Sequence, residues 1–177
     1  MSMFSGIFSS QINWDKASSE QKLAALSKLP PNDPMLEQVA LGDAEATVRH
    51  AAIALLSGDA LLRLVGACQA GDEASLAARL AETLDAAAMA SNDTVATLLA
   101  APLALRIDLI GHVKGEVLAT ALVQSLTDDA DRARVARGKG AIDARVAALR
   151  AMHDVTALES IAHDFRDKQR GIYRAAR

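Results

Sequence analysis

Apolar residues recur along the chain at the spacing of three and four residues that is typical of helices with one buried face. The first predicted helix carries Leu23 and Leu26 on that face, and Pro30-Pro31 ends it. Isoleucine, valine, threonine and tyrosine are too few and too scattered to build a sheet. The pattern therefore predicts an all-α protein.

Polar residues with short side chains mark the starts of the predicted helices. Ser18 is followed three residues later by Gln21, which is the signature of a capping box, and Asp33 is followed by a proline at the first helical position. Several further aspartates follow a glycine that closes the preceding helix. There a carboxylate can accept hydrogen bonds from the first backbone amides of the next helix. We expect structural caps at Ser18, Asp33, Asp43, Asp59, Asp72 and Asp154.

The second half of the chain has the same pattern with weaker boundaries. A long helix is predicted from Asp129 through Leu149, and Gly138 is expected to bend or break it, because glycine in a helix interior costs about 1 kcal/mol relative to alanine. The last helix is expected to begin near Arg166 and to continue to Arg177. No second helix is expected to complete its hairpin.

Segments of the chain resemble one another at a regular interval. The linking aspartates at positions 43 and 72 are 29 residues apart, and Asp131 follows at about twice that distance. Units of about 30 residues joined by short turns are typical of stacked, antiparallel helical hairpins. The sequence thus predicts an α-solenoid of about five hairpins over residues 15–177. We expect this single helical-repeat domain to be truncated at its C-terminal end.

The N-terminal segment, residues 1–14, contains three of the five aromatic residues, Phe4, Phe8 and Trp14. A terminal repeat needs its open apolar face covered, so this segment is expected to cap the first hairpin. The alternative is an amphipathic anchor for a partner or for a membrane surface.

The order of residues from Leu36 to Leu56 carries a family resemblance. It reads Leu-x-x-Val-Ala and then Asp-x-x-x-x-Val-Arg-x-x-Ala, which resembles a HEAT-like repeat of the armadillo type. The segment from Leu158 to Arg177 is similar, with Gln169-Arg170 in the place of Val48-Arg49. Together they are similar to the N-terminal repeat region of the bacterial domain-of-unknown-function family 349. The resemblance implies an α-solenoid that serves as a protein-binding scaffold.

Charge is unevenly distributed along the chain. The net charge is −3, with −6 in residues 1–127 and +3 in residues 128–177. The basic C-terminal part predicts a possible contact surface for an anionic partner at Arg132, Arg134, Arg137 and Arg145. A nucleic-acid-associated module is therefore one alternative function. The sequence pI of about 5.8 and the absence of aromatic residues between Trp14 and Phe165 favour an ordinary solvated face.

Candidate catalytic chemistry is sparse. Cys68 is the only cysteine, so no internal disulfide can form, and its neighbours predict a small buried side chain. No serine lies in a nucleophile elbow, and Gly138-Lys139-Gly140 lacks the other elements of a phosphate-binding loop. The sequence predicts neither a catalytic residue nor a cofactor.

Two His-Asp pairs, His153-Asp154 and His163-Asp164, raise a metalloenzyme as a second alternative. A dinuclear site needs further ligands, and the other histidines, His50 and His112, belong to different predicted repeats. Both pairs also fall at helix boundaries, where capping explains them. We therefore predict no metal site.

The first ten residues lack the basic start and apolar run of a signal peptide, and no stretch is long enough to span a membrane, so a cytoplasmic protein is expected. The predicted function is a non-catalytic scaffold or adaptor for a protein partner. Because the last repeat is expected to be incomplete, Phe165, Ile172 and Tyr173 are predicted to form an exposed partner-binding face.

Overall fold

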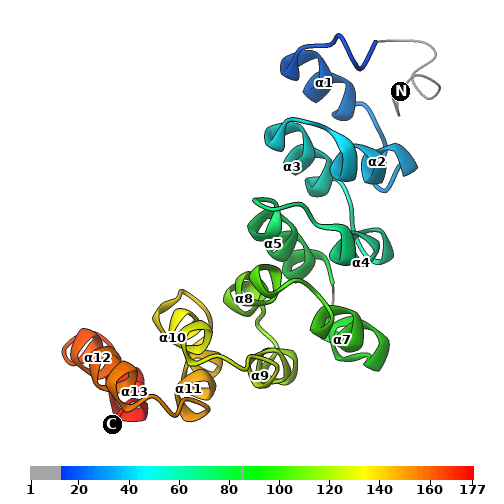
Figure 1. The fold of residues 1–177 in the computed structure, drawn as a ribbon. Coiled ribbons are helices and arrows are strands. Elements are labelled where there is room, and N and C mark those ends of the chain that lie inside the picture. The colour runs from blue at the N-terminus through cyan, green and yellow to red at the C-terminus, as the bar shows by residue number, and fades with distance from the viewer. Residues whose placement is uncertain (1–12, 85) are drawn as a thin grey trace. The chain divides into compact units, whose positions relative to one another are not determined.

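The computed structural model describes residues 13–84 and 86–177 of the chain (Figure 1). Over these residues it contains 13 α-helices and one short 3-10 helix, and no strand. The all-α prediction is therefore confirmed for the part of the chain that is described. The chain divides into two compact units, Met1–Thr83 and Leu84–Arg177, here called the first unit and the second unit. The continuous α-solenoid and the single domain stay predictions.

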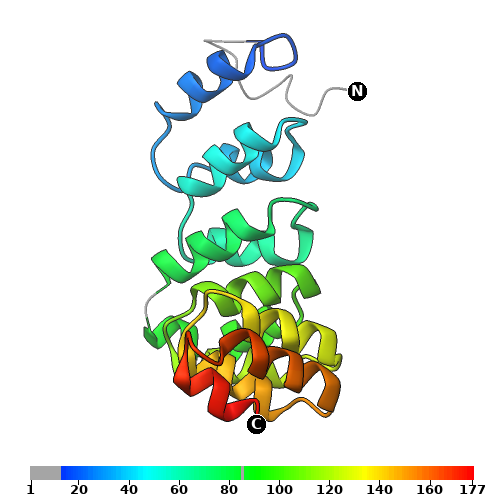
Figure 2. The same cartoon turned by 90° about the vertical axis from the view of Figure 1, so that its left-hand side faces the viewer.

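The first unit is built from short helices joined by short turns. Within it, α1 packs against α3 and α3 against α5, while α2 contacts both α3 and α4 (Figures 1 and 2). Alternate helices thus lie in two layers. The elements are α1 (Ser19–Leu26), α2 (Pro34–Gly42), α3 (Ala46–Ala54), α4 (Asp59–Leu64), the 3-10 helix η1 (Val65–Ala67) and α5 (Glu73–Thr83).

Asn32 shows that α2 and α3 run antiparallel. It lies just before α2, yet its backbone N–H donates to the carbonyl of Leu55 at 3.2 Å, and its side-chain oxygen accepts from the N–H of Ser57 at 2.7 Å, both just after α3. Its φ of 60° is in the left-handed region, which asparagine tolerates better than most residues. The start of α2 is thereby fixed to the end of α3.

The second unit has the same two-layered arrangement. One layer holds α8, α10 and α12, and the other holds α7, α9, α11 and α13, as Figure 1 shows and the contacts between neighbouring helices confirm. The elements are α6 (Ala86–Ala90), α7 (Asn92–Leu99), α8 (Leu103–His112), α9 (Glu116–Gln124), α10 (Asp129–Arg137), α11 (Ile142–Arg150), α12 (Val155–Phe165) and α13 (Arg170–Ala175).

The long helix predicted from Asp129 to Leu149 is broken near Gly138, as expected. Gly138 is the C-cap of α10, and α11 begins four residues later at Ile142. The loop lies close to the end of α8, because a Cβ atom at Gly140 would come within 2.9 Å of the carbonyl oxygen of Ile110. Glycine is required at this position by that close approach.

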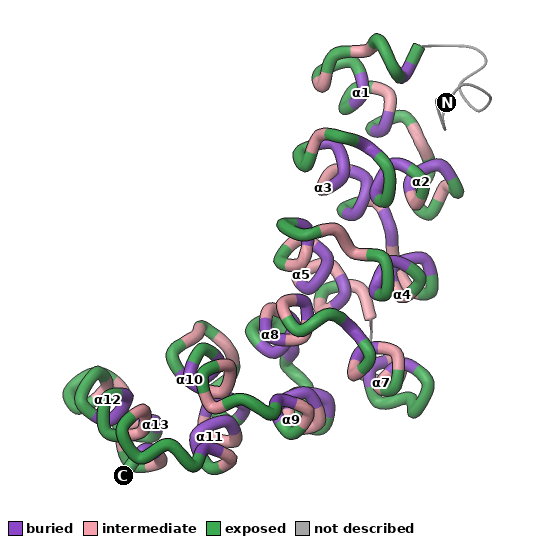
Figure 3. Tube along the Cα trace, in the orientation of Figure 1, coloured by how far each residue is buried: buried purple, intermediate pink, exposed green. Residues whose placement is uncertain are grey.

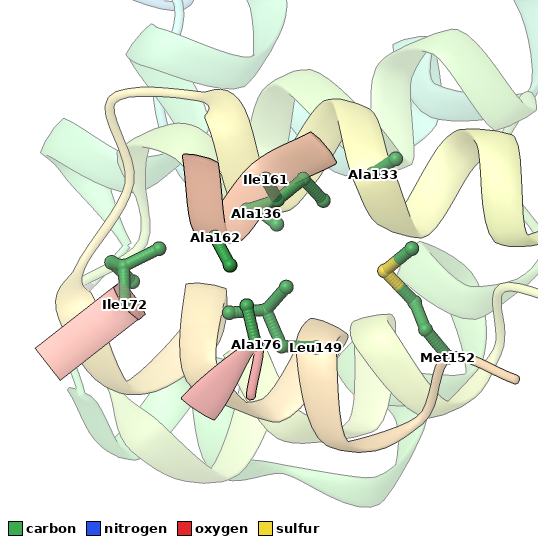
Figure 4. Packing of buried hydrophobic residues seen from close by; sticks show 8 residues of the cluster. All are labelled: Ala133, Ala136, Leu149, Met152, Ile161, Ala162, Ile172 and Ala176. Atoms are coloured by element: carbon green, nitrogen blue, oxygen red, sulfur yellow. The ribbon is translucent and has the colours of Figure 1, made fainter. Parts of the chain in front are cut away.

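Each helix buries one side, which forms the core of its unit (Figure 3). In the second unit, a cluster of buried side chains from α10 to α13 meets at the last two hairpins (Figure 4). Its members are Ala133, Ala136, Leu149, Met152, Ile161, Ala162, Ile172 and Ala176.

The helix expected to begin near Arg166 begins at Arg170, and the expected truncation of the domain stays a prediction. A polar turn at residues 166–169 ends α12 and reverses the chain, so that α13 packs against both α11 and α12. Ile172, predicted to be exposed, is completely buried in the cluster. The physical reason is that a single turn of charged residues allowed the last helix to fold back rather than continue.

Most of the predicted capping segment 1–14, including Phe4 and Phe8, lies outside the described residues. Trp14 is described and is buried in the first unit, where its indole N–H donates to Oδ2 of Asp43 at 2.7 Å. Among the described residues, no helix has both the length and the apolar content that crossing a membrane requires.

Candidate functional site

Three of the predicted caps occupy the N-cap position of a helix and bond its first turn. The hydroxyl of Ser18 accepts from the N–H of Gln21, whose side chain accepts in return from the N–H of Ser18 at 3.0 Å. Asp33 accepts from the N–H of Met35 at 2.9 Å, and Asp154 accepts from the N–H of Ala157 at 3.1 Å. These side chains satisfy amides that the helix itself leaves without a partner.

Two predicted caps are misplaced. The N-cap of α4 is Gly58 and not Asp59, because the chain enters this helix with a φ of 56° that suits glycine. Asp59 is already the first residue of α4. The N-cap of α3 is Glu45, whose side chain makes no capping bond, and Asp43 lies two residues before it.

Asp43 is instead the centre of a buried polar cluster in the first unit. Its carboxylate accepts hydrogen bonds from Lys22 at 2.9 Å, from Trp14 at 2.7 Å and from the N–H of Glu45 at 2.9 Å. Burial by itself would raise the pKa of Asp43, but these hydrogen bonds outweigh it and hold the pKa below its ordinary value. The carboxylate is thus charged and joins α1 to the turn before α3.

Asp72 has a similar role one hairpin later. Its carbonyl accepts from the N–H of Leu76 at the start of α5, as an N-cap residue does. Its buried carboxylate, however, turns to α3, where Arg49 donates to it at 2.6 and 3.0 Å and the ring of His50 lies 2.9 Å away. The sequence indicated the helix start correctly and missed the partner of the side chain.

Two of the arginines predicted to bind a partner are bound within the fold. Arg145 is buried and donates to the carbonyl of Ala136 at 2.8 Å and to the side chain of Gln169 at 2.6 Å, with its guanidinium over the ring of Phe165. Arg132 donates to Asp129 and to the carbonyl of Leu126, both at 2.6 Å. Both guanidinium groups are thus engaged inside the second unit, although the Nε of Arg132 is buried without a hydrogen-bond partner among the described residues.

Five cations, three buried and two partly buried, share a position in their helices that was not predicted. Each is the fourth residue of its helix, in α1, α3, α8, α10 and α11. At this position a long side chain reaches back to the turn beside the helix while its stem packs in the core. A basic residue among apolar ones in the first turn, such as Arg49 between Val48 and Ala52, was the available signal. The five residues are Lys22, Arg49, Arg106, Arg132 and Arg145.

The remaining predicted arginines are exposed but separately engaged. Arg137 donates to Asp164 at 3.3 Å and to the hydroxyl of Ser160 at 2.9 Å, while Arg134 lies 3.7 Å from Asp131. Since two of the four predicted arginines are bound inside the unit, the four do not form one basic surface.

The residues considered for chemistry lie apart. His153 precedes α12 and His163 lies in its last turn, so the length of the helix, about 16 Å, separates them. In the part of the chain that the structure describes, no three His, Cys, Asp or Glu side chains gather at metal-binding distance. Burial, together with the charges of Glu73 and Asp72, raises the pKa of Cys68 to about 11, which keeps the thiol protonated at neutral pH.

An open groove runs between the last two helices. It has a volume of about 620 Å³, and it is called the α12–α13 groove below. Its lining combines apolar side chains, called its floor below, with basic side chains, called its rim. Its lining residues are Val155, Leu158, Glu159, Ala162, His163, Arg166, Tyr173, Ala176 and Arg177.

Tyr173 lies in this groove between two arginines. Arg177 donates to the phenol oxygen at 3.1 Å, and its guanidinium lies 5.7 Å from the ring centre. Hydrogen bonds from Arg177 and Arg166 lower the pKa of Tyr173 below its ordinary value. Of the three residues predicted to face a partner, Tyr173 alone lines the groove, since Ile172 is buried in the core and Phe165 lies partly buried beneath Arg145.

Comparison of the chain with protein-family models, with curated proteins and with solved structures finds no match. The resemblance to HEAT-like repeats therefore stays a prediction.

Proposed function

We propose that the chain is a non-catalytic scaffold, built as an α-solenoid of helical hairpins, which binds a protein partner through the α12–α13 groove. The observation that carries this proposal is the groove itself. It is open, and its lining combines apolar side chains with the basic side chains of His163, Arg166 and Arg177. Val155, which lines the groove, is 65% exposed and is therefore accessible to a partner.

The repeated packing supports the solenoid part of the proposal. In each unit, helices two apart in the chain pack on one another, as α1, α3 and α5 do in the first unit and α8, α10 and α12 in the second. A hairpin that stacks in this way covers one of its faces, and its other face is available to a further hairpin or to a partner.

Nucleic-acid binding through the Arg-rich second half has less support. That hypothesis needs a continuous row of free cations, whereas Arg132 and Arg145 donate to groups of their own unit. The metalloenzyme alternative likewise lacks converging ligands among the described residues.

The proposal is tested by photo-crosslinking at two exposed valines. A photoreactive amino acid at Val155 in the groove should link the chain to a discrete partner protein. The same amino acid at Val117, which is 72% exposed on α9 outside the groove, is the matched control and should not.

The partner identified in this way is then purified and its affinity is measured directly. We expect Val155→Asp to weaken binding strongly and Val117→Asp to leave it unchanged, with both variants as stable as the natural chain. Equal binding by the two variants would show that the groove is not the binding site.

A further inference from the structure

The α12–α13 groove has the form of a surface on which another helix packs. Its residues on α12 include Val155, Leu158 and Ala162, with Arg166 at the C-cap, at the spacing that places them on one face of the helix. The 11 residues of α12 span about 16 Å, or about three helical turns. A partner helix can therefore contact the groove along its whole length.

The floor of the groove allows close packing. Ala162 and Ala176 line the groove, and their small side chains allow another helix to approach closely. Leu158 and the exposed Val155 stand beside them as apolar contacts. Apolar side chains at helical spacing on a partner would fill this floor and cover Val155.

The basic side chains that line the groove favour a partner with acidic side chains. His163, Arg166 and Arg177 line the groove, against the single carboxylate of Glu159. Residues 166–177 include five Lys or Arg residues and one Asp. Among the described residues, neither Arg166 nor Arg177 forms a salt bridge, so both can pair with carboxylates from outside.

Building on the scaffold function above, we infer that the occupant of the groove is an acidic amphipathic helix of another protein. Its apolar stripe lies on Val155 and Leu158, and its carboxylates beside that stripe pair with Arg166 and Arg177. A nucleic acid is less suitable, because its phosphates would leave the apolar floor uncovered. Moreover, the guanidinium of Arg177 lies near one face of the Tyr173 ring, which hinders a base from stacking there.

Three labelled peptides of about 18 residues, long enough to form a helix, test the inference by fluorescence anisotropy with the full chain. The first carries a leucine stripe flanked by Glu, the second has Lys in place of Glu, and the third keeps Glu but has Ser in place of leucine. We expect only the first to bind, with an affinity that falls as salt is added. A single-stranded DNA of equal charge should not displace it.

Charge reversal in the chain tests the contact from the other side. The double variant Arg166→Glu with Arg177→Glu should weaken binding of the first peptide by about tenfold or more. Arg150→Glu, exposed on α11 and outside the groove, is the matched control and should bind as the natural chain does. Circular dichroism melts of all variants show whether they fold equally well.

The outcomes separate this inference from the proposed function. If the Lys peptide binds as tightly and Val155→Asp prevents it, the groove binds proteins and the acidic partner is wrong. Displacement by DNA, or binding of no peptide, also overturns the acidic helix. If Val155→Asp leaves every complex unchanged, the groove is not a binding site and both proposals fail.

Discussion

The first and second units both place cations at the fourth residue of a helix. Arg132 of the second unit pairs with Asp129 of its own helix, but Arg106 and Arg145 of that unit donate to neutral groups instead. In the first unit, Lys22 meets Asp43 and Arg49 meets Asp72, so each pair is a buried salt bridge. In the second unit, Arg145 meets a backbone carbonyl and the neutral side chain of Gln169. Arg106 similarly donates to the carbonyl and hydroxyl of Ser125.

The kind of acceptor determines how much stability is lost when the cation is removed. A buried carboxylate that loses its cation is left charged in a medium that solvates it poorly, whereas a carbonyl that loses a donor is left with a smaller cost. The first unit should therefore tolerate substitution at these positions less well than the second. This expectation can be tested at matched positions.

The largest effect on stability is expected when Arg49 and Arg145 are each replaced by methionine, which is also a long side chain but carries no charge. Arg49→Met leaves the carboxylate of Asp72 buried beside His50 alone and should lower the free energy of unfolding by about 3–5 kcal/mol. Arg145→Met leaves only neutral groups and should cost about 1–3 kcal/mol. Urea denaturation followed by circular dichroism measures both, and equal losses would contradict the comparison.

A second effect depends on pH and on Asp43. Its pKa is lowered in the folded state from an ordinary value of 3.8, so its carboxylate stabilises the fold above that value and the stabilisation is lost as pH falls through the lower folded pKa. Asp43→Asn should thus cost about 2 kcal/mol at pH 7 and progressively less below pH 3.8. Thermal melts across this range give the difference, and a constant difference would rule out the buried salt bridge as its cause.

Caps provide a smaller effect that separates true from apparent cap residues. Asp154 in the second unit bonds the first turn of α12, so Asp154→Ala should cost about 1 kcal/mol. Asp59 in the first unit is already inside α4, and Asp59→Ala should change stability by about 0.5 kcal/mol or less. An equal loss of stability in both variants would show that Asp59 acts as a cap after all.

The smallest effect on stability is expected from introducing into the second unit a salt bridge like those of the first unit. Gln169→Glu places a carboxylate beside the buried Arg145 without changing the length of the side chain. We expect a gain of about 0.5 kcal/mol at pH 7 that disappears below about pH 4, because the new group has an ordinary pKa near 4.3. Stability that does not change with pH relative to the natural chain would show that position 169 is too solvated to form the pair.

Much of the helical architecture was predictable from short stretches of sequence. Ser18 and Asp33 begin helices through hydrogen bonds to amides two or three residues away, and the break near Gly138 follows from the conformational cost of glycine in a helix. Asp59 was misassigned by one residue, because the positive φ of Gly58 is a property of the path between hairpins.

The candidate site was predicted less well. Tyr173 does line the groove, but Phe165 and Ile172 do not, and the groove also contains residues of α12 that had not been predicted to bind a partner. Ile172 looked exposed because the fold-back of α13 depends on how the last two helices pack, which local spacing does not show.

The sequence by itself determined the class of the fold and most helix starts, since these depend on hydrophobic spacing and on bonds within one turn. Only the tertiary structure decided which charged residues are buried. Asp43 and Lys22 are 21 residues apart, and Asp72 and Arg49 are 23 apart. Arg145 and Arg134 are the same residue type, yet Arg145 is buried and Arg134 is exposed. The cause is that burial and pairing depend on which distant segments meet, and this is a property of packing rather than of residue type.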